Sequence, residues 1–438
     1  MNRIYSYYNF LLQNGSTSVL YNAATDGLLV LDSNLIECIK DNKENIGNLQ
    51  MIHPDLYTAM LEKGMIVDAT INESDAIIER WKQEDNDSAH FFLTILPTLN
   101  CNLRCWYCYE EHMENSNMTD ETMDRIIRFI DNVTKRAPEL KYFHLDFFGG
   151  EPLLPFKKRV MPILQKTVAF CKERNVQLFI HFTTNGVLLT EEVRKELLSL
   201  DIPHKPGFQI TLDGNRKLHD CSRYTATKQP TYDIIVKNIK GALQDGMNVN
   251  CRFNYTVNSV DTFVDVLDEF KDLTEEERNL LFFDFQQVWQ ESALTEVRNK
   301  AMNLAKLFTS CSQQVRIEKR YNKQRCRDDA ENQASINYNG LVYKCTAFNM
   351  TEELCEGVLN EKGEIEWNER YKKRMSVKYG NSACRNCKIF PICHGGCSQT
   401  KLQALNKENC IFNYSESQRL DIIKGRIEYI LCNKRTDY

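Results

Sequence analysis

The sequence predicts an α/β protein whose centre is a partial (β/α)6 TIM-like barrel. Three observations predict this fold class. Apolar strands alternate with amphipathic helices from residue 91 onward, shorter strands and helices occupy the first 90 residues, and the regular pattern ends after residue 310. Strands that alternate with helices build a parallel sheet with helices outside it. Six such units suit a partial barrel better than a complete eight-stranded one.

The composition is that of a folded protein with several domains. The chain has 438 residues, of which 42% are hydrophobic and 26% charged, and its formal net charge is −5. This length exceeds one ordinary core, and a slightly negative chain has no basic field for nucleic acid. No apolar run is long enough to span a membrane, and the N-terminus lacks the order of a secretory signal. We expect a cytoplasmic protein with neither a nucleic acid nor a membrane as partner.

The first 90 residues are predicted to form a small domain that could fold by itself. Its strands are expected at 5–12, 16–22, 27–32 and 65–69, and its helices at 33–41 and 53–64. The polar stretch 82–90 is interpreted as an exposed linker.

The barrel domain is predicted over 91–310. Its strands are expected at 91–98, 143–150, 178–185, 208–214, 248–257 and 281–289, and its helices at 119–136, 160–175, 191–200 and 231–246. A cysteine-rich domain is predicted over 311–415, and a C-terminal helix within 416–438.

Cysteine is unusually frequent, with 17 residues in a chain that has no export signal. A reducing compartment favours metal binding or catalysis over disulfides. Ten of the cysteines fall into two groups, over 101–108 and 326–410. The other seven are interpreted as small buried hydrophobic residues: Cys38, Cys171, Cys221, Cys251, Cys311, Cys355 and Cys432.

The first group, Cys101, Cys105 and Cys108, follows the first predicted barrel strand, where barrel enzymes place their chemistry. Three thiolates can hold three irons of a cubane cluster and leave the fourth iron open. A zinc knuckle is the alternative, although zinc cysteines usually come as two separated pairs. With Tyr107 as the aromatic residue, the spacing C-x3-C-x-aromatic-C resembles the radical S-adenosylmethionine (SAM) family, and the resemblance covers about 95–290. It implies a [4Fe-4S] cluster that binds the methionine part of SAM and yields a 5′-deoxyadenosyl radical.

Polar or glycine-rich tips end the next three predicted strands. In Gly149-Gly150-Glu151-Pro152 the glycines allow a close approach to a ligand, and a carboxylate can accept a hydrogen bond from an ammonium group. The resemblance implies that this loop holds the methionine amino group; a simple strand-to-helix turn is the alternative. The remaining cofactor contacts implied by the resemblance lie at the third and fourth strand ends and just beyond them: Thr184, Asn185, Thr211, Asp213 and Arg223. Thr211 and Arg223 are expected at the methionine carboxylate, which suits a bidentate donor. A surface salt bridge is the alternative for Arg223.

The second cysteine group resembles the seven-cysteine SPASM domain, which carries two auxiliary [4Fe-4S] clusters in its relatives; a two-zinc ribbon is the alternative. The resemblance implies that one cluster is held by Cys384, Cys387, Cys393 and Cys410. It implies that the other receives Cys326, Cys345 and Cys397. With the first cluster, the chain would hold three. The eighth auxiliary ligand stays open between Cys311, Cys355, a non-cysteine ligand and an open iron.

The function predicted from this combination is peptide maturation. The first 90 residues resemble a winged-helix recognition domain that binds the leader of a ribosomally made precursor peptide as an added strand; a structural cap on the barrel is the alternative. The product would be an intramolecular thioether or carbon–carbon cross-link, with flavodoxin or ferredoxin as electron donor. Maturation of a sulfatase is a second possibility, but those enzymes usually have an aspartate after the cysteine that corresponds to Cys345, where this chain has Thr346. A non-catalytic iron–sulfur or leader-binding scaffold is the third.

No general base is assigned; Asp146 and Asp284 are candidates by position only, and Gln286 and Gln287 could line the pocket.

Overall fold

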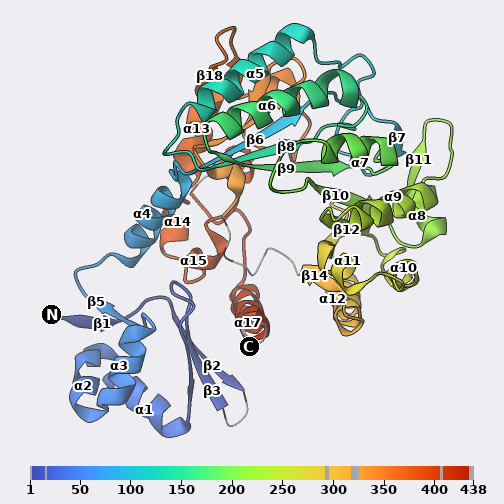
Figure 1. Cartoon of the computed structure of the whole chain (residues 1–438). Helices are drawn as coiled ribbons and strands as arrows, with labels where there is room; N and C mark the ends of the chain where they lie inside the picture. Colours follow the sequence, from blue (N-terminus) through green and yellow to red (C-terminus); the bar gives the residue numbers. More distant parts are fainter. Residues whose placement is uncertain are drawn as a thin grey trace. The chain divides into compact units, whose positions relative to one another are not determined.

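The computed structural model describes residues 2–14, 17–291, 295–316, 323, 325–404 and 408–433. The chain divides into two compact units (Figure 1). The first consists of Met1–Asn86, Lys319–Ala330 and Lys373–Tyr438, and the second of Asp87–Glu318 and Glu331–Lys372. The predicted cysteine-rich range 311–415 therefore contributes to both units, and the four predicted domain ranges stay a prediction.

The second unit is built on one large sheet with the strand order β14-β13-β12-β10-β9-β8-β6-β15-β16-β17-β18. Its six successive parallel strands are β6 (His90–Leu96), β8 (Tyr142–Phe147), β9 (Gln177–Thr184), β10 (Gly207–Leu212), β12 (Val249–Tyr255) and β13 (Leu281–Gln287). All six lie where the sequence predicted strands, so the partial barrel is confirmed. β14 (Gln314–Arg316) and β15 (Gln333–Asn337) extend the parallel part at its two sides, and β16 (Leu341–Tyr343), β17 (Gly357–Leu359) and β18 (Ile365–Trp367) continue it antiparallel.

Helices cover one face of this sheet (Figure 1). The four predicted helices are α5 (Asp120–Thr134), α6 (Met161–Glu173), α7 (Glu191–Leu198) and α9 (Tyr232–Gln244). In β8, Phe143, Leu145 and Phe147 are fully buried in the core that these helices share, whereas the alternate residues are partly exposed. The strand alternation thus gives the barrel an apolar outer face and a more polar inner face.

Several helices were not predicted. Between β12 and β13 the chain forms η3 (Val260–Asp265), α10 (Val266–Glu269) and α11 (Glu275–Leu280), and after β13 it forms α12 (Thr295–Ser310). The first three are each too short to show a helical period of apolar residues.

The first unit contains the predicted N-terminal strands and helices. β2 (Asn9–Asn14), β3 (Thr17–Asn22) and β4 (Leu28–Leu31) form an antiparallel sheet, and β1 (Arg3–Tyr5) pairs with β5 (Ile66–Asp68). The helical part consists of α1 (Ser33–Asn42), η1 (Lys43–Asn48), α2 (Leu49–Ile52) and α3 (Pro54–Glu62). Alternate residues of β3 enter different cores: Leu20 packs with α1 and α3, and Tyr21 packs with Trp81 and the C-terminal helix α17 (Glu416–Asn433). The sheet is therefore apolar on both faces.

The predicted N-terminal domain shares one of its cores with segments from the C-terminal part of the chain. Ile422, Ile423 and Ile427 of α17 share a core with Trp81 and with the segment around Ile389. α17 lies where the sequence predicted a helix, and it begins with two reciprocal bonds: Gln418 N donates to Ser415 Oγ at 3.3 Å, and Ser415 N donates to Gln418 Oε1 at 2.9 Å. No helix in the described ranges is long and apolar enough to cross a membrane.

The interpretation of 82–90 as exposed is wrong for Asp85, although most of the other side chains in this stretch are exposed and the chain passes from the first unit to the second between Asn86 and Asp87. Helix α4 (Glu73–Asp85) continues to Asp85, and His90 already begins β6. Asp85 is only 4% exposed, because Arg325 donates two hydrogen bonds to it at 2.8 and 3.2 Å and Lys378 Nζ lies 3.3 Å away. The polar sequence gave no sign of this buried carboxylate, because Arg325 and Lys378, which pair with it, lie more than two hundred residues later in the chain.

We predict that Asp85→Asn destabilises the protein by about 3–5 kcal/mol, because it leaves two buried cations without their anion. Urea unfolding measures the change. Glu84→Gln is the matched control, since Glu84 is the next residue and its ion pair with Arg80 is exposed, so that variant should change stability by less than about 1 kcal/mol. Equal effects of the two variants would contradict the prediction.

Candidate functional site

The loop that carries Cys101, Cys105 and Cys108 starts at the carboxyl end of β6. Part of it forms a short strand, β7 (Leu103–Cys105), which pairs antiparallel with β11 (Arg223–Thr225), so that Cys105 lies opposite Arg223. Neither strand was predicted, because three residues carry no readable period. The pairing fastens the cysteine loop to a segment more than a hundred residues later in the chain.

The three thiols differ in exposure, but burial raises the pKa of all three. Cys101 is buried, Cys105 is half-buried and Cys108 is exposed. Desolvation raises the pKa of Cys101 to about 12 and that of Cys108 to about 11. Because a metal binds the thiolate, iron would have to displace these protons, and its positive charge would add to the partial compensation that Arg223 gives.

Gly149 and Gly150 allow the loop after β8 to lie directly against the cysteine loop. Gly149 has φ +111°, and a Cβ on Gly150 would stand 2.2 Å from the carbonyl oxygen of Asn100. Gly150 N donates to Thr98 O at 3.2 Å, and Glu151 N donates to Asn100 O at 2.8 Å. The sequence predicted a close approach of these glycines to a ligand; the neighbour that the structure gives them is the backbone just before Cys101.

Glu151 is fully buried, and its carboxylate organises the end of β9. It accepts hydrogen bonds from Thr184 Oγ1 at 2.7 Å, from Asn185 N at 2.8 Å and from Leu153 N at 3.0 Å. Burial raises the pKa of Glu151, and these bonds act in the opposite direction. The expected bond to an ammonium group would thus add to three existing ones.

Asn185 continues this chain of contacts to the cysteine loop. Its side-chain nitrogen donates to Asn102 Oδ1 at 2.7 Å and to Cys101 Sγ at 3.7 Å. Glu151, Thr184 and Asn185, which the sequence assigned to one site, are therefore in one hydrogen-bonded network with Cys101.

Tyr107 connects Asp213 and Arg223 on the other side of the loop. Its hydroxyl donates to Asp213 Oδ2 at 2.7 Å and accepts from Arg223 Nη1 at 2.7 Å and from Asn254 Nδ2 at 3.2 Å. Arg223 is only 6% exposed, which excludes the surface salt bridge. Desolvation raises the pKa of Asp213 to about 6.

Two buried polar atoms of this group have no hydrogen-bond partner among the described residues, namely Asp213 Oδ1 and Arg223 Nε. A buried donor or acceptor without a partner is costly. The pair therefore offers one acceptor and one donor to a polar ligand beside the cysteine loop, which fits the amino acid part of SAM.

Thr211 lies on the inner face of the barrel, in register with Arg252 and, one strand further, Asp284. All three side chains are partly exposed. Gln286 Nε2 donates to Asp284 Oδ1 at 2.7 Å, so this carboxylate is already hydrogen-bonded. Asp146 is on the partly exposed face of β8. These positions give the inner face polar groups but single out no general base.

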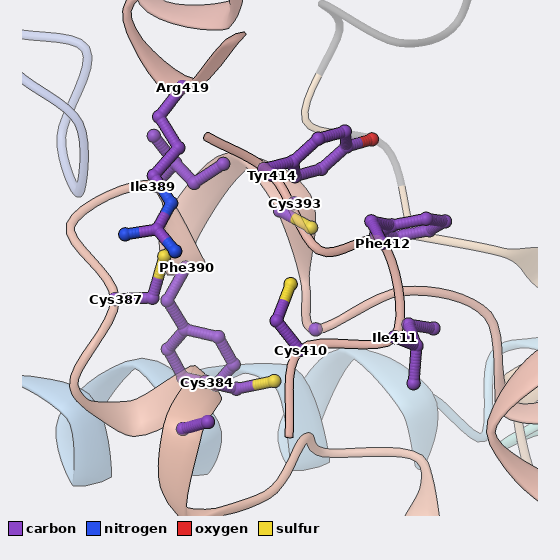
Figure 2. Close-up of a pocket in the computed structure, with 12 residues that line it drawn as sticks. Cys384, Cys387, Ile389, Phe390, Cys393, Cys410, Ile411, Phe412, Tyr414 and Arg419 are labelled. Carbon is purple, nitrogen blue, oxygen red and sulfur yellow. The ribbon is translucent and has the colours of Figure 1, made fainter. Parts of the chain in front are cut away.

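A second cysteine site lies in the first unit. Cys384, Cys387, Cys393 and Cys410 line one pocket with about 450 Å³ of empty space (Figure 2); we call these four residues the cysteine ring. Cys384 is on α14 (Ser382–Arg385), and Cys393 ends α15 (Phe390–Cys393). The remaining lining is mostly apolar: Ala383, Ile389, Phe390, Gly395, Ile411, Phe412, Tyr414 and Arg419.

The cysteine ring fits a cluster by its donor set. Four thiols face one cavity, and no His, Asp or Glu is among the residues that line it. Desolvation raises the pKa of Cys393 to about 12, and the neighbouring Cys384, Cys387 and Cys410 act in the same direction. Thiolates packed this closely repel one another unless a cationic group lies between them. Gly395 is needed here because a Cβ would stand 3.0 Å from Cys384 Sγ.

The other predicted auxiliary ligands are less clearly grouped. Cys326 and Cys397 belong to the first unit, where Cys397 acts to raise the pKa of Cys326, and Cys345 belongs to the second. Cys311 is exposed just after α12, and Cys355 is half-buried. No three His, Cys, Asp or Glu side chains in the described ranges converge closely enough to hold a single metal ion. This second ligand set stays a prediction.

Residues 95–273 match the Radical SAM superfamily. The chain carries a radical SAM domain. A cysteine-type anaerobic sulfatase-maturating enzyme of Clostridium novyi is 24% identical over 337 residues, which cover 69% of this chain and 86% of that protein. With its radical SAM domain at 95–273, the chain is a radical SAM enzyme. Its cysteine-rich C-terminal part fits a SPASM extension.

Two solved structures share the fold of this radical SAM enzyme. Native anSMEcpe with bound AdoMet and Kp18Cys peptide has a TM-score of 0.59 and 18% identity, over 78% of this chain and 99% of that one. SuiB of Streptococcus suis bound to precursor peptide SuiA has a TM-score of 0.53 and 15% identity, over 94% of this chain and 100% of that one.

We predict that Asp213→Asn costs less stability at pH 7.5 than at pH 5. The pKa of Asp213 is about 6 in the folded protein and about 3.9 in an unfolded chain. The folded state therefore holds this proton more tightly, and the native Asp213 lowers stability increasingly as the pH rises through 4–6. The difference in cost should be about 1–1.5 kcal/mol by urea unfolding at the two pH values. A cost that is equal or larger at pH 7.5 would contradict it.

We predict that Cys105→Ala abolishes release of 5′-deoxyadenosine from SAM under dithionite, because the first cluster loses one of its three thiolates. Cys387→Ala should retain release, since this thiol lies in the cysteine ring. Chromatography of the quenched reaction measures the product. Equal release by the native protein and both variants would contradict the assignment of the first cluster.

Proposed function

We propose that this radical SAM enzyme is a peptide maturase that installs an intramolecular thioether or carbon–carbon cross-link in a ribosomally made precursor. In this proposal residues 1–90 recognise the leader of the precursor, 91–310 carry the radical chemistry, and 311–415 hold the auxiliary clusters, followed by the C-terminal helix within 416–438. The observation that carries the proposal is the N-terminal sheet, which a barrel does not need for SAM cleavage.

The N-terminal sheet has the properties of a strand-addition site. Each of its faces contributes residues to a core, which leaves its edges as the place for an added peptide. Among the described residues, β2 and β4 each pair on one side only. Lys388 Nζ lies 5.6 Å from the ring centroid of Phe10, on β2. β4 is therefore the better edge, and its Val30 is 64% exposed. An unpaired edge provides main-chain hydrogen bonds for an extended peptide.

The barrel residues would bind the first cluster, SAM and the peptide. Cys101, Cys105 and Cys108 hold the first cluster, and together with SAM it supplies a 5′-deoxyadenosyl radical when bound. Glu151 orients Asn185, while Tyr107 holds Asp213 and Arg223 toward the amino acid part of SAM. Thr211 would join Arg223 at the methionine carboxylate, and the rest of the inner barrel face would receive the peptide.

The cross-link also fixes the electron balance. Forming it removes two hydrogen atoms from the peptide; one leaves with the 5′-deoxyadenosyl group, and the other leaves as a proton and an electron. The auxiliary clusters would accept that electron, and a flavodoxin or ferredoxin would serve as the redox partner in a reducing, cytoplasmic compartment.

The comparisons support a peptide substrate. SuiB was solved with the precursor peptide SuiA, and its fold likeness extends over 94% of this chain, against 78% for anSMEcpe. Sulfatase maturation is the second candidate because of the 24% identity to the Clostridium novyi enzyme. Thr346 after Cys345, where those enzymes usually have an aspartate, disfavours it. A scaffold without turnover is disfavoured by the buried network around Tyr107, which a non-catalytic chain would not need.

We predict that a short open reading frame beside this gene encodes the precursor, and that co-expression removes two hydrogen atoms from it per modification, as measured by mass spectrometry of the peptide. Deleting the leader from the peptide should abolish the change, and Cys105→Ala in the enzyme should abolish it as well. An unmodified full-length peptide together with active SAM cleavage would contradict peptide maturation. Conversion of a leaderless sulfatase peptide to formylglycine would establish the second candidate.

A further inference from the structure

The pocket of the cysteine ring contains one side chain that ligation does not explain. Arg419, in the first turn of α17, is the only Lys, Arg, Asp or Glu among the residues that line the pocket. Figure 2 shows its side chain extending toward Cys387. Consistent with this, Arg419 and Cys387 act with opposite signs on the pKa of the same neighbour, Tyr7.

The hydrogen-bonding state of Arg419 is unusual for a partly buried arginine. Its Nε is buried and has no hydrogen-bond partner among the described residues, and none of the ion pairs found there includes this side chain. A guanidinium has five N–H donors and is always charged, and leaving a buried donor unsatisfied is costly. The pocket is therefore arranged for an acceptor that carries negative charge.

Helix stability does not account for Arg419 either. Its backbone N donates to Ser415 O at 3.1 Å, so the residue lies in the first turn of α17. A positive charge is unfavourable there, because the helix dipole is positive at its N-terminus. Arg426, further along α17, differs in this respect: it donates to Asp26 at 2.7 and 3.2 Å and thereby fixes the helix.

The buried cation beside Cys384, Lys401, already has a partner. Lys401 is buried, and its Nζ donates to Lys378 O at 3.1 Å. It influences Cys384 electrostatically. Arg419 is thus the cation at the ring whose donor remains unsatisfied.

We propose that Arg419 sets the reduction potential of the auxiliary cluster that the cysteine ring holds. This rests on the assignment of that cluster, but not on the identity of the peptide. A [4Fe-4S] group gains one electron on reduction and breaks no bond, so its charge becomes more negative by one. A guanidinium beside the sulfurs stabilises the reduced form more than the oxidised form, because both its charge and its N–H bonds favour the more negative state. Arg419 therefore makes this cluster a better acceptor of the electron that leaves the substrate.

The test is a redox titration of the reconstituted full-length protein, followed by electron paramagnetic resonance. The transition that belongs to the cysteine ring is the one missing in Cys387→Ala. In Arg419→Gln the midpoint potential of that transition should fall by ~59 mV. For a one-electron transfer this corresponds to an equilibrium constant for reduction of the cluster that is about tenfold smaller. Lys424→Gln is the matched control, because it removes the same charge from an exposed position of the same helix and should leave the transition unchanged.

Each outcome decides the proposal. A full iron content in Arg419→Gln with an unshifted transition overturns it. If Arg419→Gln binds fewer irons, Arg419→Lys decides, since it keeps the charge: restored iron supports an electrostatic role, and continued loss means that Arg419 acts by packing, which overturns the proposal. Release of 5′-deoxyadenosine should stay at the native level in Arg419→Gln, so a failure of peptide maturation is distinguishable from a failure here.

Discussion

The site depends on the backbone contact between Gly149-Gly150 and residues 98–100. A side chain at Gly150 would overlap the carbonyl oxygens of Asn100 and Leu99, so the loop after β8 could not approach the loop that carries Cys101. Two backbone hydrogen bonds hold the loops together. The contact works only because β6 and β8 are adjacent and parallel, which brings their carboxyl ends to one edge of the sheet. The geometry of the first cysteine site therefore follows from strand order and from two missing Cβ atoms.

Around this contact the protein buries charge that it only partly compensates. Glu151 accepts hydrogen bonds from Thr184 and Asn185 on both of its oxygens, whereas Asp213 and Arg223 share Tyr107 and each keep an unsatisfied buried atom. Elsewhere, as at Asp85, a buried carboxylate has two cations beside it and is fully paired. The difference favours a structural ion pair at Asp85 and a site for a polar ligand beside Tyr107, because a ligand can satisfy the donor and the acceptor left without partners there.

The sequence predicted the barrel well because each strand and helix has a strong period of its own. It also predicted the members of the Cys101 network and of the cysteine ring, since strand ends and cysteine spacings are local signals. It could not predict the β7–β11 pairing, which joins Cys105 to Arg223 across more than a hundred residues. It was wrong at Asp85 for a related reason: a carboxylate in a polar stretch looks exposed until the arginine that buries it, Arg325, is in place. Arg419 was missed because its neighbours in sequence are polar and its pocket is assembled from separate segments.

One consequence of the shared core concerns the N-terminal sheet. Tyr7 Oη donates to the carbonyl oxygen of Asn386 at 2.7 Å, Arg385 pairs with Asp75, and Lys388 lies over the rings of Tyr7 and Phe10. All these contacts reach the segment that contains Cys387. The residues that position β2 are therefore the same ones that flank a ring thiol, and α17 packs against both. A ring without its cluster would lose the constraint on this segment, and the N-terminal sheet would lose part of its support, because a shared core transmits such a change.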